Sequence, residues 1–306
     1  MRAVATLIAV TATVQQVLAQ GSAISASTYN NIIQYTRFAR ASYAATCATP
    51  PNGSVVLNYF TDSATSSSAT LFQWDAGKQI VLSFRGTAVP ANWNTDLDFP
   101  LTALTGTSCS GCQVHEGFQK LHNALAPAAI SAVKAAVAKT GYSFVLTGHS
   151  LGGALASIAT ASFGASGIKI AATYTYGEPR NGNSQFGSYA LGFVGLANYY
   201  RVTHSNDGVP SIPPSAIGFS HHGNEYWEKN SGFNNTQAST VMCASVLNQE
   251  PLVGKLSAFE TSADINQFCN LGTSSGDNPI NYAHVSYSND VIGNVLHIHD
   301  CGASYP

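Results

Sequence analysis

Hydrophobic and polar positions along the chain predict alternating strands and helices. Helical spacing of apolar residues marks 28–45 and 118–139, and Gly141 follows the second stretch as a stop signal. Short β-branched and aromatic runs predict strands at 55–59, 71–74, 79–84, 142–147, 170–176 and 198–204, and further helices follow residue 150 and lie around 185–190. This alternation indicates an α/β fold, a mostly parallel sheet with helices on both faces. No repeat or linker divides the chain.

One of these strand-to-helix transitions carries a serine at its turn. The segment 142–156 reads as an apolar strand, then Gly148-His-Ser150-Leu-Gly152, then a helix of small residues. The two glycines leave room for a sharp turn, and the free N–H groups of the following helix lie where negative charge would develop on an attacked carbonyl. This context predicts a nucleophile elbow at Ser150. The alternative is a surface Gly-Ser turn.

A serine nucleophile needs a histidine base and an acid that orients it. Asp207 follows a strand in the order Ser, Asp, His that such folds use, although an Asn-Asp-Gly turn also needs a short polar residue for its own hydrogen bonds. The histidines after Asp207 are His221, His222, His284, His297 and His299. The first two follow too closely, and the last two alternate with apolar residues as in a strand. His284 therefore remains as the base.

Composition adds a location and excludes some partners. The chain has 306 residues, of which 45% are hydrophobic and 9% charged, and its formal net charge of −2 leaves no basic patch for nucleic acid. Residues 1–19 have one charge, a short apolar centre and a small-residue end, which predicts a secretory signal peptide. No other stretch is apolar for long enough to be a transmembrane anchor. We therefore expect residues 20–306 to form one extracellular catalytic domain.

Six cysteines, an even number, favour disulfides in that compartment, with 15 possible pairings. The pair Cys109 and Cys112 has the spacing of a redox or zinc half-site, but without a second such pair a local bridge is favoured. The His-x-His at His297 and His299 lacks a third ligand, so we expect no metal. Asn52 and Asn234 lie in Asn-x-Ser/Thr sequons and are candidate glycosylation sites.

Several short motifs together resemble the fungal class 3 lipase family, which includes triacylglycerol lipases, mono- and diacylglycerol lipases and feruloyl esterases. They are Ser-Phe-Arg-Gly-Thr at 83–87, Val-His-Glu-Gly-Phe at 114–118, Thr-Gly-His-Ser-Leu-Gly-Gly-Ala at 147–154, Tyr-Thr-Tyr-Gly-Glu-Pro-Arg-Asn-Gly-Asn at 174–183, Asn-Asp-Gly-Val-Pro at 206–210 and Ala-His-Val-Ser-Tyr at 283–287. The resemblance covers nearly all of 20–306 and is weakest at 227–279, to which it gives no role.

The resemblance implies the α/β-hydrolase fold and the catalytic residues Ser150, Asp207 and His284. It implies an oxyanion hole at Thr87 and at the backbone N–H of Leu151. It also implies disulfides between Cys47 and Cys301 and between Cys109 and Cys112, which leaves Cys243 with Cys269. The chemistry of this family needs no cofactor.

The segment 88–100 lies where lipases of this family carry a lid. Val89, Trp93 and Leu97 fall at helical spacing between polar residues, which predicts a short amphipathic cover that turns toward lipid. This favours a lipase that acts on acylglycerol esters at a lipid–water interface. The alternatives are a feruloyl esterase acting on plant cell-wall hydroxycinnamate esters and a catalytically silent secreted binding protein.

Overall fold

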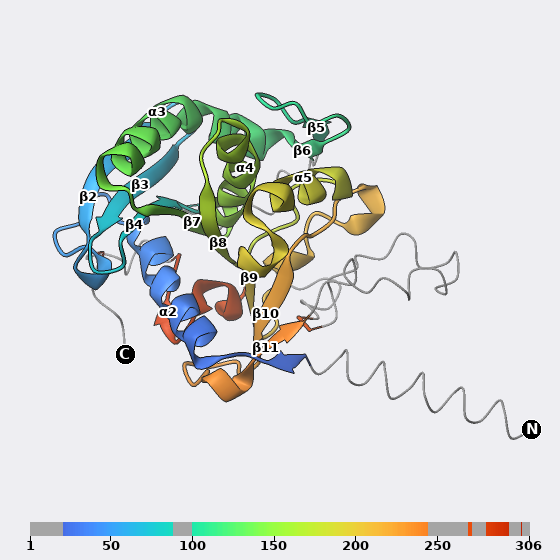
Figure 1. Cartoon of the computed structure of the whole chain (residues 1–306). Coiled ribbons are helices and arrows are strands. Elements are labelled where there is room, and N and C mark those ends of the chain that lie inside the picture. The colour runs from blue at the N-terminus through green and yellow to red at the C-terminus, as the bar shows by residue number, and fades with distance from the viewer. Residues whose placement is uncertain (1–20, 88–99, 244–268, 271–279, 294–300, 302–306) are drawn as a thin grey trace, which may run out of the picture.

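A nine-stranded sheet forms the middle layer of the molecule (Figure 1). The computed structural model describes residues 21–87, 100–243, 269–270, 280–293 and 301. The sheet order is β1-β11-β10-β9-β8-β7-β4-β3-β2, in which β4, β7, β8, β9 and β10 are parallel and both edges are antiparallel. The strands are β1 Ser22–Ala23, β2 Val55–Asp62, β3 Ser67–Trp74, β4 Gln79–Phe84, β7 Ser143–His149, β8 Ile170–Tyr176, β9 Tyr199–His204, β10 Asn224–Glu228 and β11 Thr240–Cys243.

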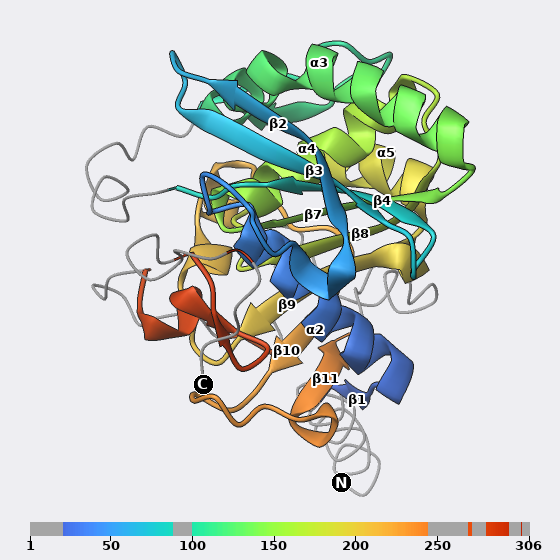
Figure 2. The same cartoon turned by 90° about the vertical axis from the view of Figure 1, so that its left-hand side faces the viewer.

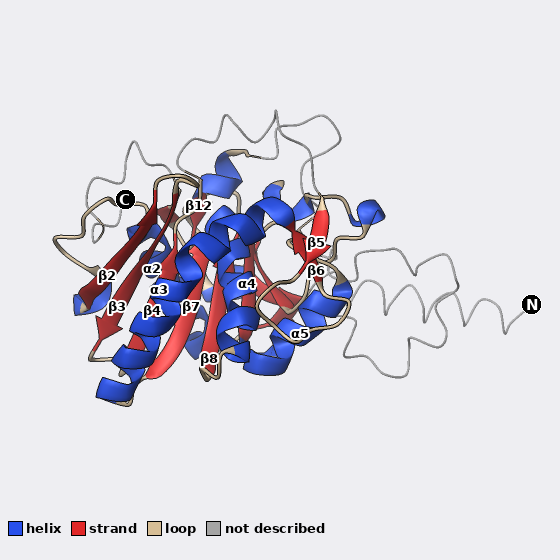
Figure 3. Cartoon of the chain, turned by 90° about the horizontal axis from the view of Figure 1, so that it is seen from above, coloured by secondary structure: helices blue, strands red, loops and turns tan. Residues whose placement is uncertain are grey.

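Helices cover both faces of this sheet. Helix α2 (Ala26–Ala41) lies on one face, and α3 (Glu116–Thr140), α4 (Leu151–Ala165) and α5 (Ser184–Val194) lie on the other (Figure 2). Seen from above, these three helices stand in front of the strands and α2 stands behind them (Figure 3). The predicted fold class, a mostly parallel sheet between helices that matches the α/β-hydrolase fold, is confirmed for the centre of the sheet.

Alternation of side chains explains why central strands such as β4 carry apolar residues on both faces. In β4, Ile80 and Leu82 belong to the core under α3 and α4, whereas Val81 belongs to the core under α2. Both faces of the strand are therefore buried. Helix α3 is long and apolar enough to cross a membrane by composition alone, yet Leu125 and Val133 on it pack into the core against the sheet.

Shorter elements connect these layers. Two small antiparallel pairs are β5 (Leu101–Ala103) with β6 (Gln113–His115), and β12 (Ser286–Tyr287) with β13 (Asp290–Val291). The 3-10 turns are η1 Pro51–Gly53, η3 Leu196–Asn198, η4 Val209–Ser211, η5 Ser215–Ile217, η6 Gln237–Ser239 and η8 Tyr282–Val285. The bonded cysteine pairs are Cys47 with Cys301, Cys109 with Cys112, and Cys243 with Cys269, the same pairs that the resemblance implied.

The structure differs from the predicted elements mainly at the edges of the sheet. The predicted strands 55–59 and 71–74 are longer in the structure, because β2 and β3 extend into the polar residues between them and form a hairpin. In its turn the Asp62 carboxylate accepts the N–H of Thr65 at 2.8 Å. Helix α2 ends at Ala41 and not at residue 45. The missed ends of the two strands, 61–62 and 67–70, consist mainly of Thr, Ser and Asp, so they have no hydrophobic pattern to mark them as strand.

The structure also adds strands that the sequence pattern missed. Strand β10 ends just inside the region 227–279 and β11 lies within it. Both extend the sheet, and β11 pairs with β1 from the start of the described chain. Strand β10 contains Glu225 and Glu228, which are both buried. Two carboxylates within five residues hide the strand pattern, because buried charges are rare without partners.

Candidate active site

Ser150 lies between the end of β7 and the first residue of α4 with a strained backbone, φ 59° and ψ −129°. A Cβ on Gly148 would collide with the backbone of Gly152, and a Cβ on Gly152 would collide with the carbonyl of Phe84. The two glycines therefore allow the strand, the turn and the helix to pack this closely. The result is the sharp elbow that the sequence predicted.

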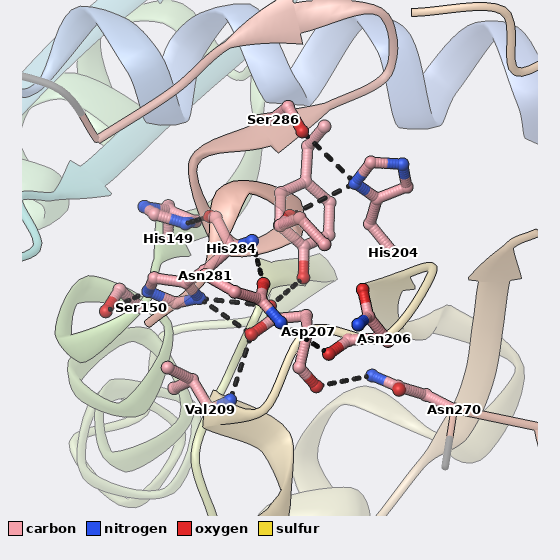
Figure 4. A network of polar contacts seen from close by, with 12 residues as sticks. His149, Ser150, His204, Asn206, Asp207, Val209, Asn270, Asn281, His284 and Ser286 are labelled. Carbon is pink, nitrogen blue, oxygen red and sulfur yellow. Dashed lines mark hydrogen bonds and ion pairs between the residues drawn. The ribbon is translucent and has the colours of Figure 1, made fainter. Parts of the chain in front are cut away.

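The side chains of Ser150, His284 and Asp207 form a continuous chain of hydrogen bonds (Figure 4). The distance from Ser150 Oγ to His284 Nε2 is 2.9 Å, and His284 Nδ1 lies 3.0 Å from each oxygen of the Asp207 carboxylate. All three residues are buried, with exposed fractions of 5%, 3% and 0% in that order. The carboxylate fixes the proton on Nδ1, so Nε2 is free to accept the serine proton.

Asp207 has further partners that hold its carboxylate in place. Its Oδ1 accepts the backbone N–H of Val209 at 2.9 Å, and its Oδ2 accepts the hydroxyl of Tyr287. The first of these bonds is the local turn contact that an Asn-Asp-Gly sequence predicts. The same side chain therefore both stabilises its turn and contacts His284.

His149, next to the serine, connects three parts of the site. Its Nε2 donates to the backbone carbonyl of His284 at 2.7 Å, and its Nδ1 accepts the hydroxyl of Tyr43 at 2.8 Å. Burial lowers the pKa of His149 well below its usual value, and the nearby His284 lowers that pKa further. His149 is therefore neutral, and the carbonyl partner places its proton on Nε2.

Thr87 and Leu151 both lie close to the serine. Thr87 follows β4 and lines a small pocket together with Ser150, Ile280 and His284. Leu151 occupies the first position of α4, where the helix offers its N–H no internal acceptor. Both positions are suited to stabilising negative charge beside the serine hydroxyl.

Other predicted residues lie elsewhere or outside the described residues. Val89, Trp93 and Leu97 of the expected lid, His297, His299 and the expected signal peptide 1–19 all fall outside the described ranges. The Nε2 of His221 is bonded to the carbonyl of Pro210, and the Nε2 of His222 to the hydroxyl of Ser157, so both serve in packing.

The candidate glycosylation sites differ in accessibility. Asn234 is exposed, whereas Asn52 is half-buried with its amide nitrogen covered. In the part of the chain that the structure describes, Glu225, Cys243 and Cys269 are close enough together to suggest a metal site. The two cysteines are bonded to each other and so offer no thiolate to a metal ion.

Sequence reasoning missed several partners of the site. Tyr287 follows His284 at a short interval, so the sequence contained a signal for it within the motif 283–287. Tyr43 and Asn270 approach the site from remote segments without a local motif, and Asn281 contacts the Asp207 turn as well as its own helix. The assembled site can activate a serine hydroxyl for attack on a carbonyl carbon and stabilise the oxyanion that forms.

Comparisons with a family model and with known protein sequences both find similarity to lipases. Residues 81–216 match the family model described as "Lipase (class 3)". A secreted mono- and diacylglycerol lipase 1 of Fusarium solani is 41% identical over 156 residues, which cover 50% of this chain and 45% of that protein. The secreted mono- and diacylglycerol lipase A of Penicillium cyclopium is 33% identical over 177 residues, 57% of this chain and 56% of that protein. The match thus spans about half the length of these relatives.

The fold is also similar to solved structures. A triacylglycerol lipase described as having a serine protease triad as its catalytic centre is 25% identical, with a TM-score of 0.67 over 89% of this chain and 98% of that chain. The fold of that lipase therefore covers most of the present chain.

Proposed function

Because the chain belongs to the class 3 lipase family, we propose that it is a secreted serine hydrolase of carboxylic esters, with acylglycerols as its substrates. The observation that carries this proposal is the buried hydrogen-bond chain from Ser150 through His284 to Asp207. The names of its secreted relatives support extracellular location. The proposal includes a signal peptide at 1–19 and one catalytic domain at 20–306.

In the proposed reaction, His284 accepts the proton of Ser150 as the serine oxygen attacks the ester carbonyl. Asp207 stabilises the imidazolium that forms, and the N–H of Leu151 together with Thr87 stabilises the oxyanion. His284 then donates its proton to the leaving alcohol, and an acyl-enzyme remains. Water, activated by the same histidine, releases the acid and restores the serine.

The distances support this sequence of proton transfers. His284 Nε2 lies within hydrogen-bond reach of Ser150 Oγ before any substrate is bound. The neutral His149 beside it avoids a second positive charge when His284 is protonated. The low exposure of all three groups strengthens their electrostatic interaction relative to water.

We include a lid at 88–100, with Val89, Trp93 and Leu97 on its apolar side, in the proposal on sequence grounds. Such a lid predicts that the protein hydrolyses esters in lipid droplets faster than dissolved esters. Glycans at Asn234, which is exposed, agree with secretion, whereas Asn52 has to move before its amide nitrogen is accessible.

The test is the hydrolysis rate of a medium-chain glyceride measured at concentrations that cross its solubility limit, with methyl ferulate assayed in parallel. We expect the rate to rise steeply once droplets form and methyl ferulate to remain intact. Saturation below the solubility limit with rapid ferulate release would identify a feruloyl esterase. No hydrolysis of either ester, with folded protein, would leave the binding-protein alternative.

A further inference from the structure

The turn that carries Asp207 is held by side chains from two later segments of the chain. The amide nitrogen of Asn281 donates to the backbone carbonyl of Asn206 at 2.8 Å. The amide nitrogen of Asn270 donates to the backbone carbonyl of Asp207 at 3.0 Å. Two consecutive carbonyls of the turn are therefore occupied by asparagine amides (Figure 4).

Asn281 also contacts the segment of His284. Its Oδ1 accepts the backbone N–H of His284 at 3.2 Å, and Asn281 is the N-cap residue of η8. A single side chain therefore joins the turn of the acid to the turn of the base. Any movement of one turn relative to the other has to break one of these two hydrogen bonds.

Asn270 is fixed by its own surroundings. It is 4% exposed, and it follows Cys269, which is bonded to Cys243 on β11. Its backbone N–H donates to Glu225 Oε1 on β10 at 3.3 Å. The sheet and the disulfide thus set the position from which Asn270 reaches the carbonyl of Asp207.

We propose that Asn270 and Asn281 are positioning residues that fix the Asp207 carboxylate against His284, and through His284 set the contact with Ser150. The inference rests on the proposed hydrolase function. Neither asparagine touches a reacting atom, so both act through the acid and the base. Positions of catalytic groups that shift by about 1 Å can lower rates on the order of 100-fold.

A purely structural role would predict a different result, and Asn198 supplies a control for the loss of the same kind of bond away from the site. Its amide nitrogen donates to the carbonyl of Val194 at 3.0 Å, the same kind of bond as that made by Asn270. It precedes β9, whereas Asp207 follows β9, so the two lie beyond opposite ends of that strand. Asn198→Ala removes one such bond away from the site.

The experiment measures the rate at which a fluorophosphonate labels the full secreted chain. We expect Asn270→Ala and Asn281→Ala each to lower the second-order labelling rate roughly 10-fold to 100-fold, and Asn198→Ala to stay within about twofold of the wild type. Asn281→Ala and Asn198→Ala should each lose a few degrees of Tm, about 2–4 °C. Asn270→Ala should lose more, because Asn270 is buried whereas Asn198 is exposed.

Two further measurements separate positioning from loop stability. Asn281→Ser keeps a hydroxyl that can cap the N–H of His284 but does not reach Asn206, so its Tm should recover while labelling stays slow. Weaker support of the imidazolium should move the acidic limb of the kcat/KM profile for a soluble ester to lower pH in both alanine variants. Asn198→Ala should leave that limb in place.

The effect should also depend on the acid itself. In an Asp207→Ala background, Asn270→Ala should change the labelling rate by less than about twofold, because the amide of Asn270 holds the turn of the acid and no carboxylate remains to be positioned. Equal losses in both backgrounds would overturn the proposal. So would asparagine variants that label at the rate of Asn198→Ala.

The outcome for the wild type separates this inference from the proposed function. A wild-type chain that is neither labelled nor able to hydrolyse esters would overturn both. A wild type that is rapidly labelled, with unaffected asparagine variants, would overturn only the positioning role. Should Asn270→Ala fail to fold, the two Asn281 variants carry the same test.

Discussion

Ser150 has an unfavourable backbone conformation and lies at the sharp turn between β7 and α4. A positive φ of 59° in a residue with a Cβ costs on the order of 1–3 kcal/mol. Its N–H donates to the carbonyl of Tyr176 at 2.8 Å, and its carbonyl accepts the N–H of Gly153 at 2.9 Å. These bonds fix the residue from both sides, so the strain is maintained by the strand and the helix that meet there.

Glu178 is a second residue whose environment matters, because its burial makes the stability of the protein depend on pH. It is fully buried, and its carboxylate accepts hydrogen bonds from Thr175, Tyr199 and Asn181. Burial raises its pKa from 4.5 to about 7, although its hydrogen bonds and the charge of Arg201 oppose that rise. Between pH 4.5 and about 7, the folded protein therefore keeps a proton on Glu178 that the unfolded chain has already released.

This pKa gives a prediction with a definite sign. Since the folded-state pKa is raised, the stability from Glu178 is present below pH 4.5 and is lost as the pH rises through about 7. We expect that loss to be roughly 3 kcal/mol, and we expect Glu178→Gln to lack it. Urea unfolding of both proteins between pH 4 and 8 measures the difference, and parallel stability profiles would contradict the assigned cause.

At the site, sequence reasoning selected three residues with local signals, and the structure brings these three together. Ser150 lies between diagnostic glycines, and Asp207 and His284 stand in short motifs at the required order. Asn270 had no such signal, because its contact with Asp207 depends on how β10, β11 and the bond between Cys243 and Cys269 arrange the chain. Contacts made across remote segments are not encoded in any one stretch of sequence.

Among the elements, the elbow places the tightest demands on side-chain size. Gly152→Ala would push a methyl group into the backbone carbonyl of Phe84, so we expect a loss of roughly 3 kcal/mol or more in stability. Gly192, exposed near the end of α5, has open space around it. Gly192→Ala should instead stabilise the protein by about 0.5–1 kcal/mol through helix propensity.

Chemical denaturation of the two variants beside the wild type checks this pair. A Gly152→Ala variant as stable as the wild type would contradict the close approach of α4 to the end of β4. A destabilised Gly192→Ala would show that its position is not helical in solution.

The elements that were predicted well are those buried on both faces. Strands β4 and β8 match their predicted ranges because both are rich in apolar, β-branched and aromatic residues and lie between two helical layers. Strand β10 was missed because Glu225 and Glu228 interrupt its pattern, and only their buried partners, Thr203 and Ser288 among them, make the strand tolerable. The hydrophobic pattern of one segment does not reveal hydrogen-bond partners that other segments supply.

At the scale of the whole molecule, the disulfides differ in how much chain they close. The bond between Cys47 and Cys301 joins residues 254 apart, whereas that between Cys109 and Cys112 joins residues 3 apart. In the loop-entropy description, the first contributes roughly 5 kcal/mol and the second roughly 1–2 kcal/mol. Removing the first pair should therefore cost more.

Thermal and urea unfolding of the two double alanine variants test this ranking under identical conditions. The variant without Cys47 and Cys301 should unfold at the lower temperature and the lower urea concentration. Equal losses would show that the unfolded chain is not the state on which the long bond acts.

The proposed ester hydrolysis depends on Ser150 acting as the nucleophile. The most direct measurement is stoichiometric inactivation with a fluorophosphonate, with the adduct located by peptide mass spectrometry and glyceride hydrolysis followed in the same samples. We predict one adduct per molecule, on Ser150, with hydrolysis lost in proportion, and neither labelling nor hydrolysis in Ser150→Ala. An adduct on another residue, or hydrolysis that continues after Ser150 is modified, would contradict the account.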